Sequence, residues 1–209
     1  MAIVFEKFLS PKSLIVLWKI EEQASFFSEY LGNAENVISE LGNISHPQKQ
    51  LEWLASRTCV KHLCTKLGLE YQGIKKDLHN NPYLINSEGF VSLSHTHGYA
   101  TAIVSLSDEV GIDIEKVSDK LSYVSHKFLS EPEYIQADND LKTLCIYWCA
   151  KESLYKLHGR RNLSFKNNIF IDHFDRNPSV ISGKITQNDQ ITSHTLHVFY
   201  ENDFVLTVV

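Results

Sequence analysis

The sequence predicts an α+β fold with two halves of similar architecture, each a long helix packed on a small antiparallel sheet. Two observations support this fold. A long helical pattern followed by short alternating strands occurs twice, in about 105 residues each time. The chain of 209 residues is 43% hydrophobic and 11% aromatic, which is enough for a sizeable core in one or two domains.

The first half contains one long helix among predicted strands. The helix begins at Ser45-His46-Pro47-Gln48, which has the Ser-x-x-Gln form of a capping box, and Gly68 is placed to end it. The other predicted elements are strands at Ile3 to Phe8 and Leu14 to Ile20, a helix at Glu21 to Leu31, and strands at Phe90 to Ser94 and Tyr99 to Leu106.

The second half repeats this order after a strand at Gly111 to Glu115. Its other predicted elements are a short helix near Glu131 to Ala137, a long helix from about Leu141 to His158, and strands near Ile169, Ile181, His194 to Tyr200 and Phe204 to Val209. The long helix has an apolar stripe made of Leu141, Leu144, Cys145, Trp148 and Cys149. Glu152 extends this stripe, so we expect a carboxylate on the buried face that needs a cation or a lysine as partner.

Acidic and basic side chains meet in two short segments of this half. Alternation along the strand puts Asp113 and Glu115 on one face. Along the helix, Glu152 and Lys156 share a face at i, i+4 and Lys151 lies beside them. Three carboxylates and two lysines suit a magnesium ion that holds a phosphate. The alternative is a solvated strand face and an ordinary helix pair, which contributes only about 0.3–0.5 kcal/mol.

In these motifs the chain resembles the 4′-phosphopantetheinyl transferases. The motifs are Gly-Ile-Asp-Ile-Glu at 111–115 and Trp-Cys-Ala-Lys-Glu-Ser-Leu-Tyr-Lys at 148–156. Val91-Ser92-Leu93-Ser94-His95-Thr96-His97 is similar to the Ser-His element of the longer, two-half branch, the surfactin-synthetase-activating type. Arg57 is similar to the family's helix arginine. The resemblance runs from about residue 47 to about residue 158.

The resemblance implies an enzyme that moves the 4′-phosphopantetheine of coenzyme A to a serine of an acidic acyl or peptidyl carrier protein, with Mg²⁺, releasing 3′,5′-ADP. It implies two pseudo-symmetric halves with the active site at their junction and a monomer: residues 1–108 would contact the coenzyme A nucleotide and residues 109–209 would carry magnesium and catalysis. The implied residues are Asp113, Glu115 and Glu152 for the metal, Glu152 and Lys156 for catalysis, and Arg57, Ser94, His95, Lys151 and Lys156 for coenzyme A. The base is either Glu152 or a metal-bound water.

The chain departs from the family pattern at one position before the Ser-His element. Family members often carry Gly-Lys-Pro there, whereas this chain has Asn80-Asn81-Pro82. A lysine that would touch phosphate is therefore absent, and either Lys75 or Lys76 takes its place or coenzyme A binds more weakly. The departure also keeps a second reading open, a non-catalytic module that binds coenzyme A or a carrier protein. A magnesium-dependent nuclease or phosphatase is a third reading, favoured only by residue types.

Charge and composition limit the classes of protein to which the chain can belong. The formal net charge of −5 argues against binding nucleic acid or an anionic membrane through the overall field. The apolar segment from Leu14 to Ile20 is too short to span a membrane and is broken by Lys19, so we expect a cytoplasmic protein. The four cysteines are predicted to be reduced core residues; zinc binding by Cys145 and Cys149 with a distant histidine is the alternative.

Overall fold

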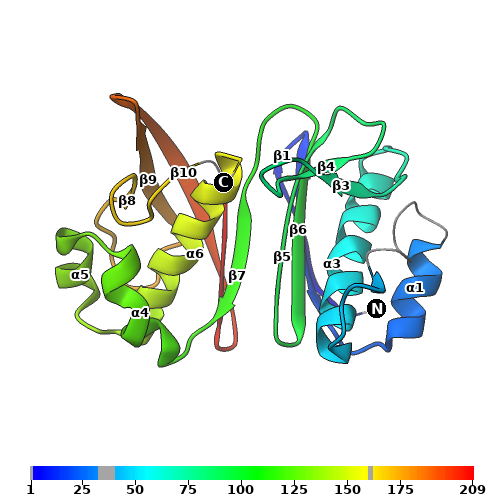
Figure 1. Ribbon diagram of the computed structural model, residues 1–209, viewed down its shortest axis with the longest axis horizontal. Helices are drawn as coiled ribbons and strands as arrows, with labels where there is room; N and C mark the ends of the chain where they lie inside the picture. Colours follow the sequence, from blue (N-terminus) through cyan, green and yellow to red (C-terminus); the bar gives the residue numbers. More distant parts are fainter. Residues whose placement is uncertain (1, 33–40, 160–161) are drawn as a thin grey trace. The chain divides into compact units, whose positions relative to one another are not determined.

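A computed structural model of the chain describes residues 2–32, 41–159 and 162–209. The chain divides into two compact units, which are residues 1–110 (unit 1) and residues 111–209 (unit 2). Both units combine helices with antiparallel sheets, so the mixed α+β class is confirmed (Figure 1). Pseudo-symmetry of the halves and a site at their junction stay predictions.

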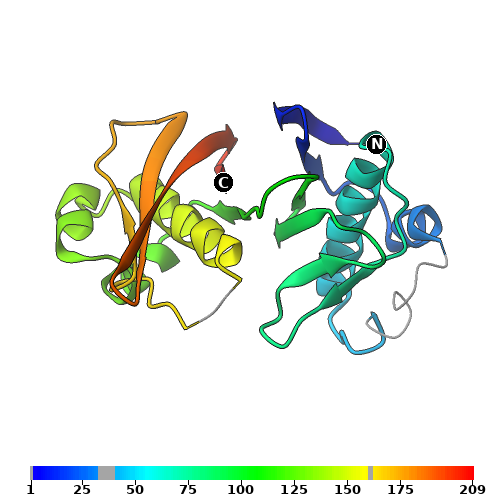
Figure 2. The same ribbon diagram turned by 90° about the horizontal axis from the view of Figure 1, so that it is seen from above.

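Unit 1 is built on a four-stranded antiparallel sheet in the order β1-β2-β6-β5. These strands are Ile3–Ser10 (β1), Ser13–Lys19 (β2), Phe90–Thr96 (β5) and Tyr99–Ser105 (β6). The long helix α3 (Pro47–Lys66) packs against β2, β5 and β6, and α1 (Ala24–Leu31) packs on α3 (Figure 2). A separate hairpin, β3 (Ile74–Lys76) with β4 (Pro82–Leu84), follows α3.

Unit 2 has a five-stranded antiparallel sheet in the order β7-β11-β10-β9-β8. Its strands are Ile112–Lys116 (β7), Ile169–Ile171 (β8), Val180–Gln187 (β9), Gln190–Glu201 (β10) and Phe204–Val208 (β11). The long helix α6 (Leu141–Leu157) packs on β7 and β11, with α4 (Lys120–Phe128) and α5 (Glu131–Ala137) against α6 (Figure 1). The strand β7, near the start of the unit, therefore packs against α6, which comes about 25 residues later in the chain.

Most predicted elements are confirmed, but three details differ. The capping box at Ser45 is wrong: the N-cap is His46, because Pro47 lacks an N–H and takes the first helical position. Gly68 ends the helix as predicted, with a φ of 73°. The first helix begins at Ala24 rather than Glu21, and the hairpin of β3 and β4 was not predicted because each strand has only three residues.

The cysteine prediction has a clear outcome. All four cysteines are free and buried, as predicted. Among the described residues, no helix combines the length and the apolar character needed to cross a membrane.

Candidate functional site

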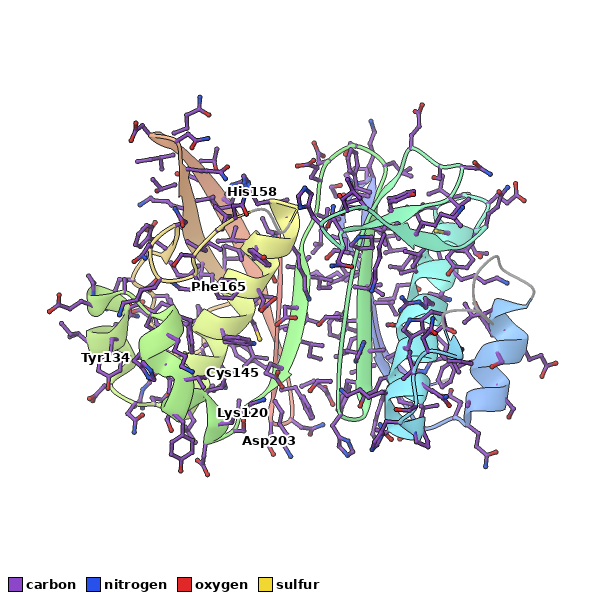
Figure 3. All side chains as sticks on the ribbon, viewed as in Figure 1. Lys120, Tyr134, Cys145, His158, Phe165 and Asp203 are labelled. Carbon is purple, nitrogen blue, oxygen red and sulfur yellow. The ribbon has the colours of Figure 1, made fainter. Side chains whose placement is uncertain are left out.

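The candidate site of unit 2 starts from the two carboxylates on β7. Asp113 lies opposite Thr207 and Glu115 lies opposite Val205 on β11, so alternation turns both to the same face. That face is covered by α6, because Lys156 of this helix contacts the Asp113 side chain. Cys145, which Figure 3 labels on the same helix, has its Sγ 3.6 Å from the backbone carbonyl oxygen of Glu115. Burial raises the pKa of the Cys149 thiol well above its usual value, and the interaction with the Cys145 thiol and the nearby carboxylates of Asp113 and Glu115 raise it further. The shared acidic face predicted for β7 thus points at α6.

Lys156 on α6 reaches the first of these carboxylates. Its Nζ lies 2.7 Å from Asp113 Oδ1 and 2.9 Å from the carbonyl oxygen of Ile112. Both side chains of this pair are 9% exposed. A buried ion pair of this kind needs good geometry and further hydrogen bonds to balance the loss of hydration. The sequence placed these two residues in one site, and the structure brings their charged atoms into direct contact.

Gly111 allows this close approach of helix and strand. A Cβ atom at Gly111 would lie 1.9 Å from the carbonyl oxygen of Ser153 and 2.9 Å from the backbone nitrogen of Leu157, both on α6. Backbone atoms cannot move aside as side chains do, so any other residue would push α6 away from β7. The glycine of the Gly-Ile-Asp motif is therefore explained by packing, two residues before Asp113.

The third predicted carboxylate, Glu152, lies on α6 but not on its buried face. Its side chain is half-buried, like that of Trp148 one turn earlier, whereas Cys149 and Ser153 are buried. Glu152 therefore continues the partly buried edge of the predicted stripe, where Leu141 and Trp148 lie, and not its fully buried centre. The reason is that α6 is covered on several sides, by β7 and β11 and also by α4, α5 and β8, so burial does not follow a single stripe.

The donor set suits magnesium by its chemistry, since a hard cation prefers carboxylate oxygens. Asp113 and Glu115 face α6, and Glu152 is carried by that helix. Within the described residues no group of three or more histidine, cysteine or acidic side chains is arranged to hold a metal ion. Asp113 already contacts a cation, the ammonium of Lys156, so positive charge is accepted at this position. The metal ligand set stays a prediction.

Lys151 lies inside the core of unit 2, apart from Lys156. Its side chain is 0% exposed, and its Nζ donates to Glu133 Oε2 at 2.8 Å and to the carbonyl oxygens of Phe165 and Ile169 at 2.8 and 2.5 Å. Burial lowers the pKa of Lys151, and the Glu133 carboxylate opposes this shift. The geometry favours an anchoring role for Lys151 over the predicted contact with coenzyme A.

Glu133, the partner of Lys151, was missed by the sequence reasoning. It is 4% exposed and accepts from the backbone N–H and the hydroxyl of Ser130 and from the backbone N–H of Ile171. The available signal was the Ser-x-x-Glu capping box of Ser130 and Glu133 at the start of α5. One carboxylate therefore joins the start of α5, the middle of α6 and β8.

A cavity of about 500 Å³ opens beside the acidic strand, within unit 2. Glu115 and Trp148 line it, together with Leu121, Val124 and Phe128, Phe165, and the lysines Lys120 and Lys127. Figure 3 labels Lys120 on α4 and Phe165 after α6. The Trp148 ring packs edge-to-face with Phe128 and at a tilt with Phe165, at centroid distances of 5.2 and 5.7 Å. The cavity is mostly apolar, with one predicted metal ligand at its edge and two lysines around it.

In unit 1, the predicted coenzyme A residues come from α3 and β5. Arg57 is buried on α3, and its guanidinium carbon lies 3.7 Å from the Trp53 ring centroid. Ser94 and His95 are consecutive on β5, opposite Thr101 and Ala100 of β6. Alternation places these two side chains on opposite faces of the strand.

His95 is the one of the pair that faces α3. Its Nδ1 lies 3.3 Å from Oε2 of Glu52, a residue on α3 that the sequence reasoning missed. The available signal was weak, because Glu52 reads as an ordinary helix residue paired at i, i+3 and i, i+4 with Lys49 and Gln48.

The segment that departs from the family pattern forms the hairpin of β3 and β4. Lys76 lies opposite Pro82 and Lys75 lies opposite Tyr83, and both lysines are exposed. Lys76 is thus placed across the hairpin from the Asn80-Asn81-Pro82 segment.

Comparison with known proteins agrees with these motifs. Residues 109–209 match the family model described as the 4′-phosphopantetheinyl transferase superfamily, and residues 39–105 match the model of the 4′-phosphopantetheinyl transferase N-terminal domain. A search of curated proteins gave no match. The first matched region covers unit 2 with the two residues before it and contains the acidic strand and α6, and the second lies in unit 1 and contains the Ser-His element. The chain therefore belongs to the 4′-phosphopantetheinyl transferase superfamily.

Proposed function

We propose that this protein transfers the 4′-phosphopantetheine of coenzyme A to a serine of an apo carrier protein and releases 3′,5′-ADP, with Mg²⁺. The observation that supports the proposal is the buried contact of Asp113 and Lys156. It sets a carboxylate oxygen, a ligand type that suits Mg²⁺, beside an ammonium, a group that suits a phosphate. Family membership implies coenzyme A and carrier proteins as partners in general. A monomer of the two-half, surfactin-synthetase-activating type is part of the proposal.

In the reaction, the serine oxygen forms a bond to the phosphorus on the pantetheine side of the pyrophosphate. The bond from that phosphorus to the bridging oxygen breaks, and 3′,5′-ADP leaves with the electron pair. We assign Glu152 to accept the hydroxyl proton, because it is the half-buried carboxylate one turn before Lys156 on α6. A base in this role contributes typically about 10²–10⁴-fold.

Charge stabilisation belongs to Lys156 and the carboxylates. A lysine ammonium has three donors, and Lys156 gives two of them to Ile112 and Asp113. We assign the third to an oxygen of the leaving phosphate, where negative charge grows. Asp113, Glu115 and Glu152 would hold Mg²⁺, which when bound neutralises and orients the pyrophosphate.

The carrier is assigned to the cavity beside Glu115. Its apolar lining, with Trp148 and Phe128, suits an apolar contact from the carrier, and Lys120 and Lys127 complement an acidic surface. This places the acceptor serine on the Glu115 side of the carboxylates.

Transfer is tested with the purified full chain, coenzyme A, Mg²⁺ and a panel of apo carrier proteins. Intact-mass spectrometry measures the mass added to the carrier, and chromatography measures the amount of 3′,5′-ADP released. We expect one phosphopantetheine added per carrier in equal amount with the nucleotide, and loss of both with Asp113→Asn or Glu152→Gln. Circular dichroism checks that the variants are folded.

Two results would count against the proposal. Binding of coenzyme A or a carrier without any mass shift would favour a non-catalytic module instead. Near wild-type transfer by Asp113→Asn would remove the assigned site.

A further inference from the structure

Two buried hydroxyl residues of unit 2, Ser153 on α6 and Thr207 on β11, have no role in the proposed reaction. Both are 0% exposed. Ser153 Oγ and Thr207 Oγ1 lie 2.7 Å apart, and Ser153 Oγ lies 3.0 Å from the carbonyl oxygen of Thr207. A carbonyl oxygen only accepts, so the Ser153 hydroxyl donates to it and the Thr207 hydroxyl donates to Ser153 Oγ. Each hydroxyl hydrogen is thereby used within the pair.

This hydroxyl pair lies next to the ion pair of Lys156 and Asp113. Thr207 is the residue of β11 directly opposite Asp113 on β7. Ser153 precedes Lys156 by three residues, so the two side chains lie on the same side of α6. The backbone of α6 also comes close to β7 at this point, since a Cβ atom at Gly111 would meet the carbonyl oxygen of Ser153. The hydroxyl pair is therefore about one helical turn and one strand away from the ion pair.

The contact of Ser153 fixes the position of α6 along β11. One turn earlier, Cys149 Sγ donates to the carbonyl oxygen of Val205 at 3.4 Å. Four helix residues advance about 6 Å and two strand residues about 6.5 Å, so the helix and the strand advance together between these two contacts. A thiol is a weak donor, so the hydroxyl contact is the stronger of the two. A slide of α6 by one residue, about 1.5 Å, would break it.

We propose that Ser153 and Thr207 are positioning residues for Lys156. Their hydroxyl pair holds α6 at the place along the sheet where the Lys156 ammonium meets Asp113, and so directs the third donor of Lys156 toward the phosphate. This inference rests on the proposed function, which assigns that donor to the phosphate. Both hydroxyls act through Lys156 and are not themselves assigned to coenzyme A, to the metal or to the carrier.

The first test needs no ligand and measures the lysine ammonium groups of the full chain by nuclear magnetic resonance. Single replacements by methionine assign the signals of Lys156 and Lys151. We expect the Lys156 ammonium to exchange its hydrogens with water about tenfold faster in Ser153→Ala and in Thr207→Val, because the loosened helix opens this contact more often. The Lys151 ammonium should exchange as in the wild type, because its acceptors include Glu133 of α5 and lie away from β11.

The second test compares kcat with KM for coenzyme A in transfer to a carrier. Ser153→Ala and Thr207→Val should each lower kcat about tenfold and change KM less than about twofold, since Lys156 acts mainly on charge that grows in the transition state. Thr207→Ser keeps the hydroxyl and should retain wild-type kcat. In a Lys156→Met background, Ser153→Ala should lower kcat no further, a result that a general loss of structure would not produce.

A matched control exists in unit 1, where Ser13 Oγ donates to Ser105 Oγ at 2.9 Å. Both serines are buried, and neither is assigned to the reaction. Ser13→Ala removes one hydroxyl from this second buried pair. It should leave kcat and the exchange of the Lys156 ammonium unchanged, whatever its effect on stability. An equal fall of kcat in Ser13→Ala and Ser153→Ala would overturn the inference.

Unchanged exchange of the Lys156 ammonium in both Ser153→Ala and Thr207→Val would also overturn it, whatever the activity. So would a further fall of kcat when Ser153→Ala is added to Lys156→Met. Failure of the wild type to modify any carrier would instead overturn the proposed function. The exchange measurement needs neither coenzyme A nor a carrier, so the two failures are told apart.

Discussion

Two lysines five residues apart on α6 each form a buried ion pair, but they differ in what their ammonium groups contact. Lys151 donates to three protein oxygens, those of Glu133, Phe165 and Ile169. Lys156 donates to two, those of Asp113 and Ile112. An ammonium has three donors, so within the part of the chain that the structure describes Lys151 uses all three on protein oxygens and Lys156 uses two. The proposed function assigns the third donor of Lys156 to the ligand.

The difference gives the two lysines of α6 different expected roles, anchoring for Lys151 and catalysis for Lys156. Lys151 joins α6 to α5 and β8 through Glu133, whereas Lys156 joins α6 to the acidic strand β7. Both lysines share charge, burial and helix, so in the proposed function the number of protein acceptors is what distinguishes the lysine assigned to phosphate from the anchoring one. Replacing each lysine by methionine, which has a similar length but no charge, tests this conclusion directly.

The largest effect is expected for Lys151→Met, on stability. The change leaves the Glu133 carboxylate buried without its cation, which typically costs about 3–5 kcal/mol in free energy of unfolding. Transfer per folded molecule should stay close to wild type, because the Lys151 ammonium spends its three donors on protein oxygens in the core. Chemical denaturation and kcat at low temperature measure the two quantities.

Glu133→Gln combined with Lys151→Met is the control for this pair. Neither partner is then left charged, and the glutamine side-chain oxygen can still accept from Ser130 or Ile171, so part of the lost stability should return. A large loss of kcat in the folded Lys151→Met protein, with normal stability, would contradict the anchoring role.

The second expected effect is a loss of kcat in Lys156→Met. Removing a donor that meets developing charge typically costs about 10²–10³-fold in kcat. KM for coenzyme A should change less than kcat, because the charge grows mainly in the transition state. Single-turnover transfer to a carrier at saturating coenzyme A measures this step. Equal kcat losses in Lys156→Met and Lys151→Met would remove the distinction between the two lysines.

Much of the fold could be predicted from sequence because its signals are local. The stop at Gly68 and the alternation of Asp113 and Glu115 depend on neighbours in the chain, and both are observed. The capping box at Ser45 failed because the backbone of Pro47 decided the helix start. The strands β3 and β4 are too short to show a period.

The candidate site was only partly predictable. Motif spacing predicted that Lys151, Glu152 and Lys156 lie on one helix. It could not predict which of them faces the core, because α6 is packed on several sides. The partners Glu133 and Glu52 lie 18 residues from Lys151 and 43 residues from His95 in sequence. Contacts over such separations are set by the tertiary fold and leave no periodic signal.

A third prediction concerns the close approach of α6 to β7, on which the contact of Lys156 with Asp113 depends. Gly111→Ala places a methyl group against the backbone of Ser153, and such overpacking typically costs about 1–3 kcal/mol in stability. The displaced helix should also separate Lys156 from Asp113 and lower kcat, while the Lys151–Glu133 pair is retained. Thermal unfolding and kcat are the measurements. Gly98→Ala, at a glycine with open space around it and a φ of 79°, is the contrasting variant: it introduces backbone strain without a clash, so it should lower stability and leave the Lys156–Asp113 contact in place.

The smallest effect is expected at Lys76, which extends the comparison from buried lysines to exposed ones. Lys76 lies opposite Pro82, next to the position where Asn81 replaces the family's lysine. An exposed cation typically contributes only about 0.2–1 kcal/mol, so Lys76→Ala should raise KM for coenzyme A by at most about fivefold and leave kcat unchanged. Lys75→Ala is the matched control, because adjacent strand residues point to opposite faces. Adding Asn81→Lys to Lys76→Ala should restore KM; if it does not, or if Lys75→Ala has the same effect as Lys76→Ala, the hairpin does not replace the absent lysine.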